Sequence, residues 1–292
     1  MKKYFGALFA IIFLFSIKVV EAQQQTFGGS RTNLLVDGHP GFVIEPAVQA
    51  LNGRKPWAWY APTIGKYPNE SNIWLLERLV QHGFWICGID VGESWGNPSG
   101  REVFSKFYDT LMTLYQLDSK ACLIGQSRGG LMLFNWAEQP GNSLKVSRIT
   151  GIYPCCDLLS CPGLSKAANA YGMVPDTLLL HIKEYNPVDG LQSLYKAGIR
   201  IFLIHGDSDI VVPLKLNSQV VYDRYKALKG DVTLKVVNGK GHEEVPEYFQ
   251  SQEVLNFILD ELSTDTNSAS NRAIESSKRK IHKHRTHHSE VN

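Results

Sequence analysis

The chain has 292 residues, a formal net charge of +2 and a hydrophobic fraction of 43%. A charge this close to zero excludes the strongly basic composition typical of nucleic-acid-binding proteins, so we expect no nucleic-acid partner. The apolar content is sufficient for a sizeable core, and the length between the two polar termini fits one domain of about 240 residues better than two.

The first 22 residues have the features of a secretory signal peptide. Lys2 and Lys3 precede an apolar run over residues 5–17, and Val20-Glu21-Ala22 has the small-x-small pattern of a cleavage site before Gln23. An uncleaved anchor is the alternative, but the run is shorter than the roughly 20 residues that a membrane-spanning helix needs. We therefore expect cleavage, a secreted or periplasmic protein, and no stable membrane insertion after cleavage.

The other end of the chain, residues 263–292, is polar and basic and holds four histidines, His282, His284, His287 and His288. A segment of this composition cannot bury enough apolar surface to fold alone, which predicts a disordered tail. Binding of a metal or a polyanion by the histidine-rich part is the alternative.

Five cysteines lie between the two terminal segments: Cys87, Cys122, Cys155, Cys156 and Cys161. An exported protein meets conditions that permit disulfides, but the odd count leaves at least one cysteine without an intramolecular partner. The last three are close in sequence, yet the chain has no CxxC pair and no histidine at ligand spacing. We expect a local disulfide or buried thiols there, no metal site and no cofactor.

Short apolar runs alternate with longer amphipathic segments over residues 23–262, which predicts an α/β domain. The runs are nearly continuous, as in strands buried on both faces, so we expect a mostly parallel, doubly wound sheet with helices on both faces. The predicted strands cover residues 56–61, 84–90, 121–125, 148–153, 199–205 and 232–237, and the predicted helices cover 69–82, 102–117, 127–138, 213–228 and 247–262.

Residues 155–187 interrupt this alternation. The stretch is rich in Cys, Gly, Asn and Tyr and is much longer than an ordinary connection between two strands. We interpret it as a small cap insertion that covers the site and holds one or two short helices.

The clearest chemical motif is Gly125-Gln126-Ser127-Arg128-Gly129, a GxSxG pattern between a predicted strand and a predicted helix. This is the context of a nucleophile elbow, a tight turn in which glycines two positions on either side of the serine avoid collisions with neighbouring backbone. We therefore predict Ser127 as the nucleophile. The N–H of Arg128 at the helix start is the first predicted donor of an oxyanion hole.

The segments IHGDSDIVVP and NGKGH lie at the ends of the last two predicted strands and supply an acid and a base in the order Ser, Asp, His. His242 is the predicted general base, because glycines 239 and 241 suit a loop that carries a side chain across the sheet edge. Asp209 is the favoured acid because it stands further beyond its strand, and Asp207 is the alternative. His205, still within the strand, is interpreted as structural.

The motifs GQSRGG, HGDSDIVVP and NGKGH, in this order and spacing, resemble the α/β-hydrolase superfamily over residues 34–262. KPWAWYAP, the SRGG elbow, Asn135-Trp136-Ala137 and Asn186-Pro187 further resemble secreted bacterial carbohydrate-associated hydrolases related to acetyl-xylan and feruloyl esterases. The resemblance implies an α/β-hydrolase fold and hydrolysis of a small-molecule or oligosaccharide ester.

The chain departs from the pattern of many members at the second oxyanion donor. Where they carry HGG after the third strand, this chain has Trp59-Tyr60-Ala61-Pro62-Thr63, and Pro62 has no N–H to donate. Tyr60, Ala61 and Thr63 are the candidates for that donor. Trp59, Tyr60, Trp95 and Tyr153 lie at or near predicted strand ends and are candidate substrate-binding residues, with core packing as the alternative for each.

The same residues leave two other functions open. A serine peptidase could use an identical triad, and a glycan-binding module could retain the site without catalysis. A lipase is disfavoured because the insertion contains no long apolar helix.

Overall fold

The computed structural model describes residues 26–50 and 53–260. The predicted signal peptide and the predicted tail lie outside these ranges. Within them, no helix combines the length and the apolar composition that crossing a bilayer requires.

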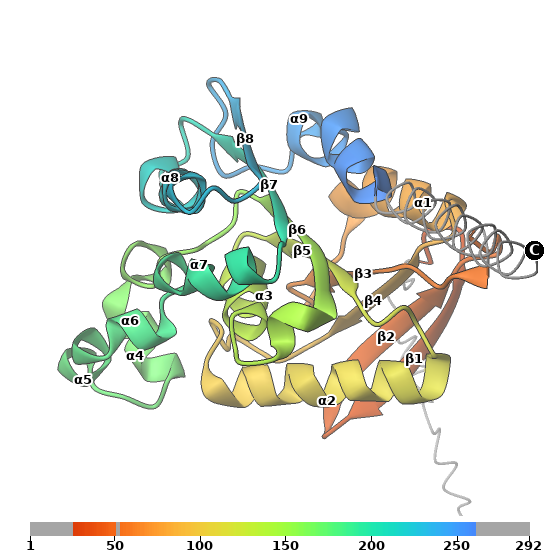
Figure 1. The fold of residues 1–292 in the computed structure, drawn as a ribbon, viewed down its shortest axis with the longest axis horizontal. Coiled ribbons are helices and arrows are strands. Elements are labelled where there is room, and N and C mark those ends of the chain that lie inside the picture. The colour runs from red at the N-terminus through yellow and green to blue at the C-terminus, as the bar shows by residue number, and fades with distance from the viewer. Residues whose placement is uncertain (1–25, 51–52, 261–292) are drawn as a thin grey trace, which may run out of the picture.

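The core of the described structure is an eight-stranded sheet in the order β1-β2-β4-β3-β5-β6-β7-β8 (Figure 1). β1 and β2 pair antiparallel, as do β2 and β4, and all the other pairs are parallel. The strands are β1 (Ser30–Val36), β2 (His39–Glu45), β3 (Trp57–Ala61), β4 (Trp85–Ile89), β5 (Ala121–Gln126), β6 (Val146–Ile152), β7 (Arg200–Gly206) and β8 (Val232–Val237). The prediction of a mostly parallel sheet is therefore confirmed.

The first two strands form a hairpin that the prediction omitted. Asp37 and Gly38 have φ angles of +53° and +80°, so both central residues of the two-residue turn are left-handed. An Asp-Gly pair between apolar runs is a strong hairpin signal, because glycine and aspartate tolerate that conformation. No tertiary contact is needed to recognise this turn, so the hairpin could be predicted from the sequence alone.

Helices cover both faces of the sheet (Figure 1). One face packs against α2 (Pro98–Tyr115), α3 (Gly129–Ala137), α7 (Pro187–Lys196) and α8 (Ser218–Ala227). The other face packs against α1 (Ile73–Gln81), α9 (Pro246–Phe249) and the helix 252–260. Short 3₁₀ helices also occur: η2 (Glu70–Asn72), η3 (Asn142–Lys145) and η5 (Leu214–Leu216).

Two predicted helix boundaries were wrong because capping was overlooked. α2 begins at Pro98, four residues before the predicted start, because Asn97 caps it by accepting a hydrogen bond from the N–H of Gly100. The last predicted helix is divided, since α9 ends at Phe249 and a new helix starts after Ser251, whose hydroxyl accepts from the N–H of Val254.

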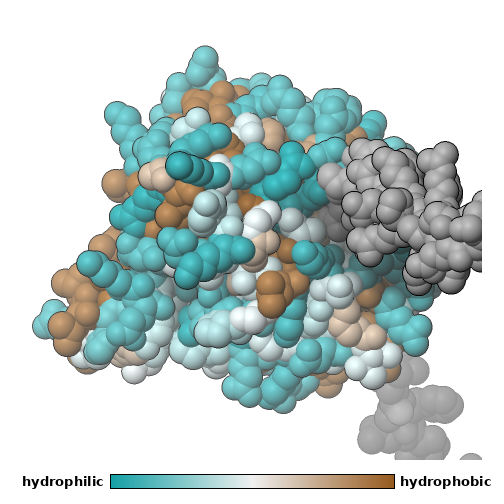
Figure 2. All heavy atoms as spheres, in the orientation of Figure 1, coloured by the Kyte–Doolittle hydropathy of each residue, from teal (hydrophilic) through white to brown (hydrophobic). Residues whose placement is uncertain are grey.

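Residues 155–187 hold three short helices, α4 (Leu164–Ala170), α5 (Pro175–Leu180) and α6 (Ile182–Tyr185), after the single turn η4 (Leu159–Gly163). They pack around a small hydrophobic cluster of their own. Val174, Leu179 and Leu180 remain exposed beside or on α5, and Figure 2 shows hydrophobic surface at the left of the molecule, where Figure 1 places this helix.

The strand order creates a switch point next to β3. The chain passes from β3 to β4 on one side and then to β5 on the other side of β3. In open α/β sheets, ligands bind outside the carboxyl ends of the strands at such a point. The segment that follows β5 begins with Ser127, so the fold places this serine at the expected position.

Candidate active site

Ser127 occupies a strained turn between β5 and α3. Its φ of +50° is in the left-handed region, which is unfavourable for a residue with a side chain. Two backbone hydrogen bonds hold it: its N–H donates to the carbonyl of Ile152 at 3.0 Å, and its carbonyl accepts from the N–H of Gly130 at 2.9 Å. The neighbouring chain thus maintains the geometry expected of a nucleophile elbow.

The elbow glycines are required by close packing. A Cβ atom on Gly129 would lie 2.0 Å from the carbonyl oxygen of Ala61, and one on Gly125 would lie 3.1 Å from the Cα of Gly130. A Cβ atom on a third glycine, Gly130, would lie 2.5 Å from the carbonyl oxygen of Cys155. Because all three contacts are to backbone atoms, no side-chain rotation could relieve them.

Replacing Gly129 by alanine is therefore expected to destabilise the protein by about 3 kcal/mol or more, the upper part of the range for overpacking. The contact that causes this is the clash with the Ala61 carbonyl. Urea unfolding of Gly129→Ala measures the loss. Gly241→Ala is the matched control, since its Cβ would meet only the Ser208 carbonyl at 3.5 Å, and it should stay within about 1 kcal/mol of the parent. Equal unfolding midpoints for the two variants would contradict the packing described.

The structure brings the three predicted catalytic side chains together. Ser127 Oγ lies 2.9 Å from His242 Nε2, and His242 Nδ1 lies 2.8 Å from Asp209 Oδ2. Ser127 follows β5, Asp209 follows β7 and His242 follows β8, so all three reach the same edge of the sheet. The Asp209 side chain is fully buried, whereas 18% of the His242 side chain is exposed on the side of the pocket.

Asp209, and not Asp207, lies against the histidine. Burial alone would raise the pKa of Asp209, but hydrogen bonds from His205, His242 and the N–H of Val212 outweigh it and hold this pKa well below its usual range. The carboxylate is thus charged when the site is at neutral pH. Asp207 instead accepts from the N–H of Gly239 at 2.7 Å and stabilises the loop that leads to His242.

Tyr153 lies under the imidazole of His242 and does not line the pocket. Only 2% of this residue is exposed, and its ring centroid is 4.5 Å from that of His242. Its hydroxyl accepts from Gln126 Nε2 at 3.0 Å, and burial raises its pKa well above the usual range, so it stays protonated. The prediction that Tyr153 binds substrate is wrong, because its ring is needed as packing beneath His242.

The predictions for Trp59 and Tyr60 are also wrong. Both are fully buried in β3. Trp59 packs between aromatic rings of α2 and α3, including Trp136 at 4.8 Å between centroids. Tyr60 faces the opposite side of the sheet and donates to Gln126 Oε1 at 2.5 Å. Both residues are core residues, which was the alternative to substrate binding, because helices cover each face of the sheet.

Three of the predicted oxyanion donors, Arg128, Ala61 and Thr63, differ in their surroundings. Within the described chain, the N–H of Arg128 has no hydrogen-bond partner, and Arg128 directly follows Ser127. Ala61 is a buried strand residue whose carbonyl oxygen lies against Gly129, so its backbone serves the fit of the elbow, and it is a poor candidate for a donor. Thr63 is half-buried, its buried Oγ1 has no partner among the described residues, and it does not line the cavity over Ser127.

A cavity of about 680 Å³ opens over Ser127 and His242. Trp95, which follows β4, lines it and is the one predicted substrate-binding aromatic that reaches it. Arg128 forms an ion pair with Glu93 and lies 5.9 Å from the Trp95 ring centroid. The remaining lining residues come from the insertion and from the loop after β7: Cys155, Ser160, Cys161, Pro162, Lys166, Asn169, Ala170, Val211 and Val212.

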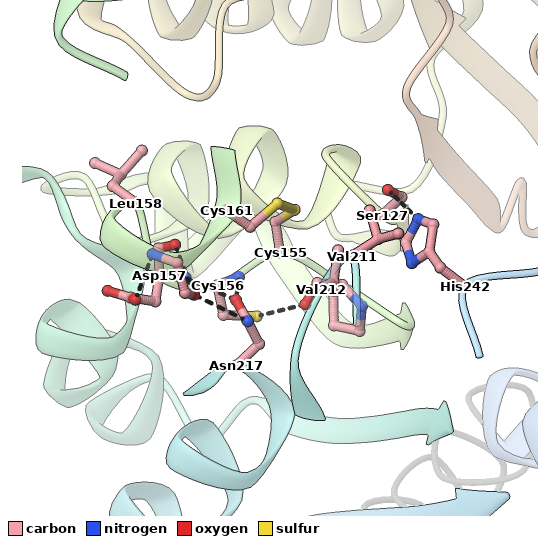
Figure 3. The surroundings of a disulfide bond; sticks show 12 residues. Ser127, Cys155, Cys156, Asp157, Leu158, Cys161, Val211, Val212, Asn217 and His242 are labelled. Atoms are coloured by element: carbon pink, nitrogen blue, oxygen red, sulfur yellow. Dashed lines mark hydrogen bonds between the residues drawn. A yellow bond between two sulfur atoms is a disulfide. The ribbon is translucent and has the colours of Figure 1, made fainter. Parts of the chain in front are cut away.

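A disulfide joins Cys155 to Cys161 near Ser127 (Figure 3). The N–H of Cys155 donates to the carbonyl of Ser127 at 2.8 Å, which ties this loop to the elbow. On the far side, the buried side chain of Asn217 accepts from the N–H of Cys156 at 2.8 Å and donates to the carbonyl of Pro213 at 3.0 Å. The start of the insertion is thereby fastened to the elbow at Ser127 and to the segment that follows β7.

These contacts decide two points left open by the sequence. The local disulfide is present, and Cys156 is a buried thiol. Across residues 26–50 and 53–260, no group of three or more His, Cys, Asp or Glu side chains is placed to hold a metal ion.

Sequence reasoning missed the individual pocket residues contributed by the insertion. Its length and composition indicated a cover for the site, but nothing local distinguished Lys166 or Asn169 from other polar residues. The role of Val211 and Val212 was also missed, although both lie within three residues of Asp209 and could have been placed near the site for that reason.

Comparison with known proteins supports the fold. No protein-family model matches the chain, and no curated protein matches it in sequence. Among solved structures, a truncated carbohydrate esterase from gut microbiota is similar with a TM-score of 0.62 and 16% identity, covering 82% of this chain and 99% of that one. Two peptidases are also similar, acylaminoacyl peptidase from Pyrococcus horikoshii and a puromycin-hydrolyzing peptidase from Mycobacterium tuberculosis.

Both peptidase matches have a TM-score of 0.60, with 16% and 15% identity, and cover 82% and 84% of this chain. The chain spans 42% and 41% of their lengths. Fold and site together define the class: this is a chain of the α/β-hydrolase fold whose strand ends bring a serine, a histidine and an aspartate into hydrogen-bonding contact.

Proposed function

We propose that the protein is a serine hydrolase that cleaves esters on small polar or carbohydrate-linked substrates. The observation that carries this proposal is the continuous hydrogen-bonded chain from Ser127 through His242 to Asp209 at the floor of an open cavity. Such a chain allows the histidine to remove the proton of the serine hydroxyl while the carboxylate stabilises the imidazolium that forms.

The reaction then follows in two steps. Ser127 Oγ attacks the ester carbonyl as its proton passes to His242 Nε2, and the N–H of Arg128 donates to the oxyanion. His242 returns the proton to the departing alcohol, leaving an acyl group on Ser127. Water, deprotonated by His242, hydrolyses this acyl-enzyme and regenerates the serine.

The chemistry of the cavity supports a polar substrate. Trp95 offers an aromatic face, and the rim carries the polar side chains of Arg128, Glu93, Lys166 and Asn169. A ring bearing hydroxyl groups fits such a mixture, because its apolar face can lie on an aromatic side chain while its hydroxyls form hydrogen bonds. The near-complete coverage of the carbohydrate esterase adds support for an ester.

Peptide hydrolysis is the second candidate, since the same triad can cleave amides and two of the similar structures are peptidases. We also propose export to the periplasm or the exterior. The Cys155–Cys161 disulfide supports it, because disulfides persist in oxidising compartments.

A substrate panel tests the proposal. The full chain is assayed against acetylated and feruloylated oligosaccharides, p-nitrophenyl esters and aminoacyl arylamides, with Ser127→Ala as the blank. We expect kcat/KM on a sugar-linked ester to exceed that on any arylamide by about 100-fold, a difference of about 2.7 kcal/mol in transition-state stabilisation.

If arylamides are turned over faster than the esters, the proposal of an esterase is wrong and the protein is a peptidase. Absence of all turnover, together with measurable calorimetric binding of an oligosaccharide, would instead identify a binding module.

A further inference from the structure

A second histidine, His205, lies behind the acid of the triad. It belongs to β7, and none of its surface is exposed. Its Nδ1 is 2.8 Å from Ser218 Oγ at the start of α8. Its Nε2 is 2.8 Å from the carbonyl oxygen of Val212 and 3.3 Å from Asp209 Oδ2.

These neighbours define the protonation of the ring. The carbonyl of Val212 and the carboxylate of Asp209 can only accept hydrogen bonds, so Nε2 carries a hydrogen that both oxygens share. In a fully buried neutral ring, Nδ1 is then the acceptor, and it receives the hydroxyl hydrogen of Ser218. The tautomer is thus assigned from the network of partners.

His205 completes the set of donors around the Asp209 carboxylate. Oδ1 accepts from the N–H groups of Val211 at 2.9 Å and Val212 at 2.8 Å. Oδ2 lies within reach of both histidines, His242 on the pocket side and His205 on the core side. A carboxylate has about four lone-pair sites, so the four donors fix its orientation completely.

We propose that His205 is a positioning residue of the catalytic site, which orients Asp209 so that Oδ2 meets His242 Nδ1. The inference rests on the proposed function for its kinetic consequences, but the geometry of the acid is independent of the substrate. Without the hydrogen bond from His205, one of the four donors that hold the carboxylate is lost, and Oδ2 has only His242 left to share its charge.

Other titratable groups face this centre. Tyr153 packs against the His242 ring, and Tyr248 lies close enough to Asp209, Asp207 and Glu243 for their charges to raise its pKa in addition to burial. The variants below leave all of these in place, so a changed titration of His242 reports on the contact between His205 and Asp209.

Two amide substitutions separate the contact made by Nδ1 of His205 from the contacts made by its Nε2. In His205→Gln, the side-chain amide nitrogen has the same bond separation from Cα as Nε2 and can still donate toward Asp209 and Val212. In His205→Asn, the amide reaches only the position of Nδ1, so it can contact Ser218 but not Asp209. Ser218→Ala is the structural control, because it removes the partner of Nδ1 and leaves Nε2 unchanged.

We expect His205→Asn to lower kcat on p-nitrophenyl acetate by about tenfold or more, as with the loss of other outer partners of a catalytic group, with KM unchanged within about twofold. The acid limb of kcat/KM should move to higher pH, because a carboxylate that has lost one donor stabilises the His242 imidazolium more strongly. His205→Gln should restore both values. Ser218→Ala should lower the urea midpoint without moving the acid limb.

The titration of the His242 imidazole by NMR in the ¹⁵N-labelled full chain, assigned with His242→Gln, gives a second measurement that needs no turnover. A higher titration point in His205→Asn, restored in His205→Gln, supports the proposal even if no ester is cleaved, in which case only the proposed function fails. An unchanged titration point in His205→Asn, or the same shift in Ser218→Ala, overturns it and reduces His205 to a packing residue.

Discussion

Replacing Ser127 by alanine is expected to lower kcat for ester hydrolysis by about 10⁴-fold or more, because the variant retains the pocket and His242 but has no nucleophile. The hydroxyl is the group that lies 2.9 Å from His242 Nε2, and the strained elbow presents it at the floor of the cavity. Initial rates on p-nitrophenyl acetate measure the loss. A fluorophosphonate reagent should label the parent protein on the peptide that contains Ser127 and leave the variant unlabelled.

Ser160→Ala is the matched control for this experiment. Its hydroxyl belongs to the same cavity but contacts Asn217 and the carbonyl of Asp157, so it lies outside the proton-transfer chain. The control should keep its rate within about threefold, a change of less than 1 kcal/mol in the activation barrier. Residual activity above one tenth in Ser127→Ala, free of contamination, would place the nucleophile elsewhere.

Replacing Asp209 by asparagine should lower kcat by about 10³- to 10⁴-fold, as expected when the orienting acid of a triad becomes an amide. If the amide oxygen keeps the hydrogen bonds from Val211 and Val212, the NH₂ group takes the place of Oδ2. That group would face the N–H of His242, which must then adopt the other tautomer and can no longer accept the serine proton.

Asp207→Asn is the matched control two residues away. Its amide oxygen can still accept from the N–H of Gly239, so the rate should change by about threefold or less. A large loss in Asp207→Asn together with an active Asp209→Asn would reverse the assignment of the acid.

The variants Asp209→Asn and Asp207→Asn also test how the stability of the protein depends on pH. The folded-state pKa of Asp209 is lowered, so its ionised form contributes stability that is complete above the unfolded-state pKa of about 3.9 and is lost as the pH falls toward the folded value. The free energy of unfolding in urea should therefore fall less between pH 6 and pH 3 in Asp209→Asn than in Asp207→Asn. An equal fall in both variants would contradict the lowered pKa.

The sequence by itself determined the sheet class and the three side chains that meet at its edge. Buried strands appear as continuous apolar runs, and a GxSxG elbow needs its glycines wherever it occurs, so both signals are local. Ser127, Asp209 and His242 follow β5, β7 and β8, and the parallel topology brings the carboxyl ends of these strands to one edge of the sheet. The Asp37-Gly38 turn is an equally local signal, although the hairpin was not predicted.

Only the tertiary structure decided which aromatic residues are core and which face the pocket. Trp59, Tyr60, Trp95 and Tyr153 all lie near strand ends, but only Trp95 reaches the cavity. A covered sheet buries both faces of β3, so periodicity cannot separate a core ring from a binding ring there. The contact of His205 with Asp209 was likewise invisible, because it depends on how the loop after β7 folds back onto its own strand.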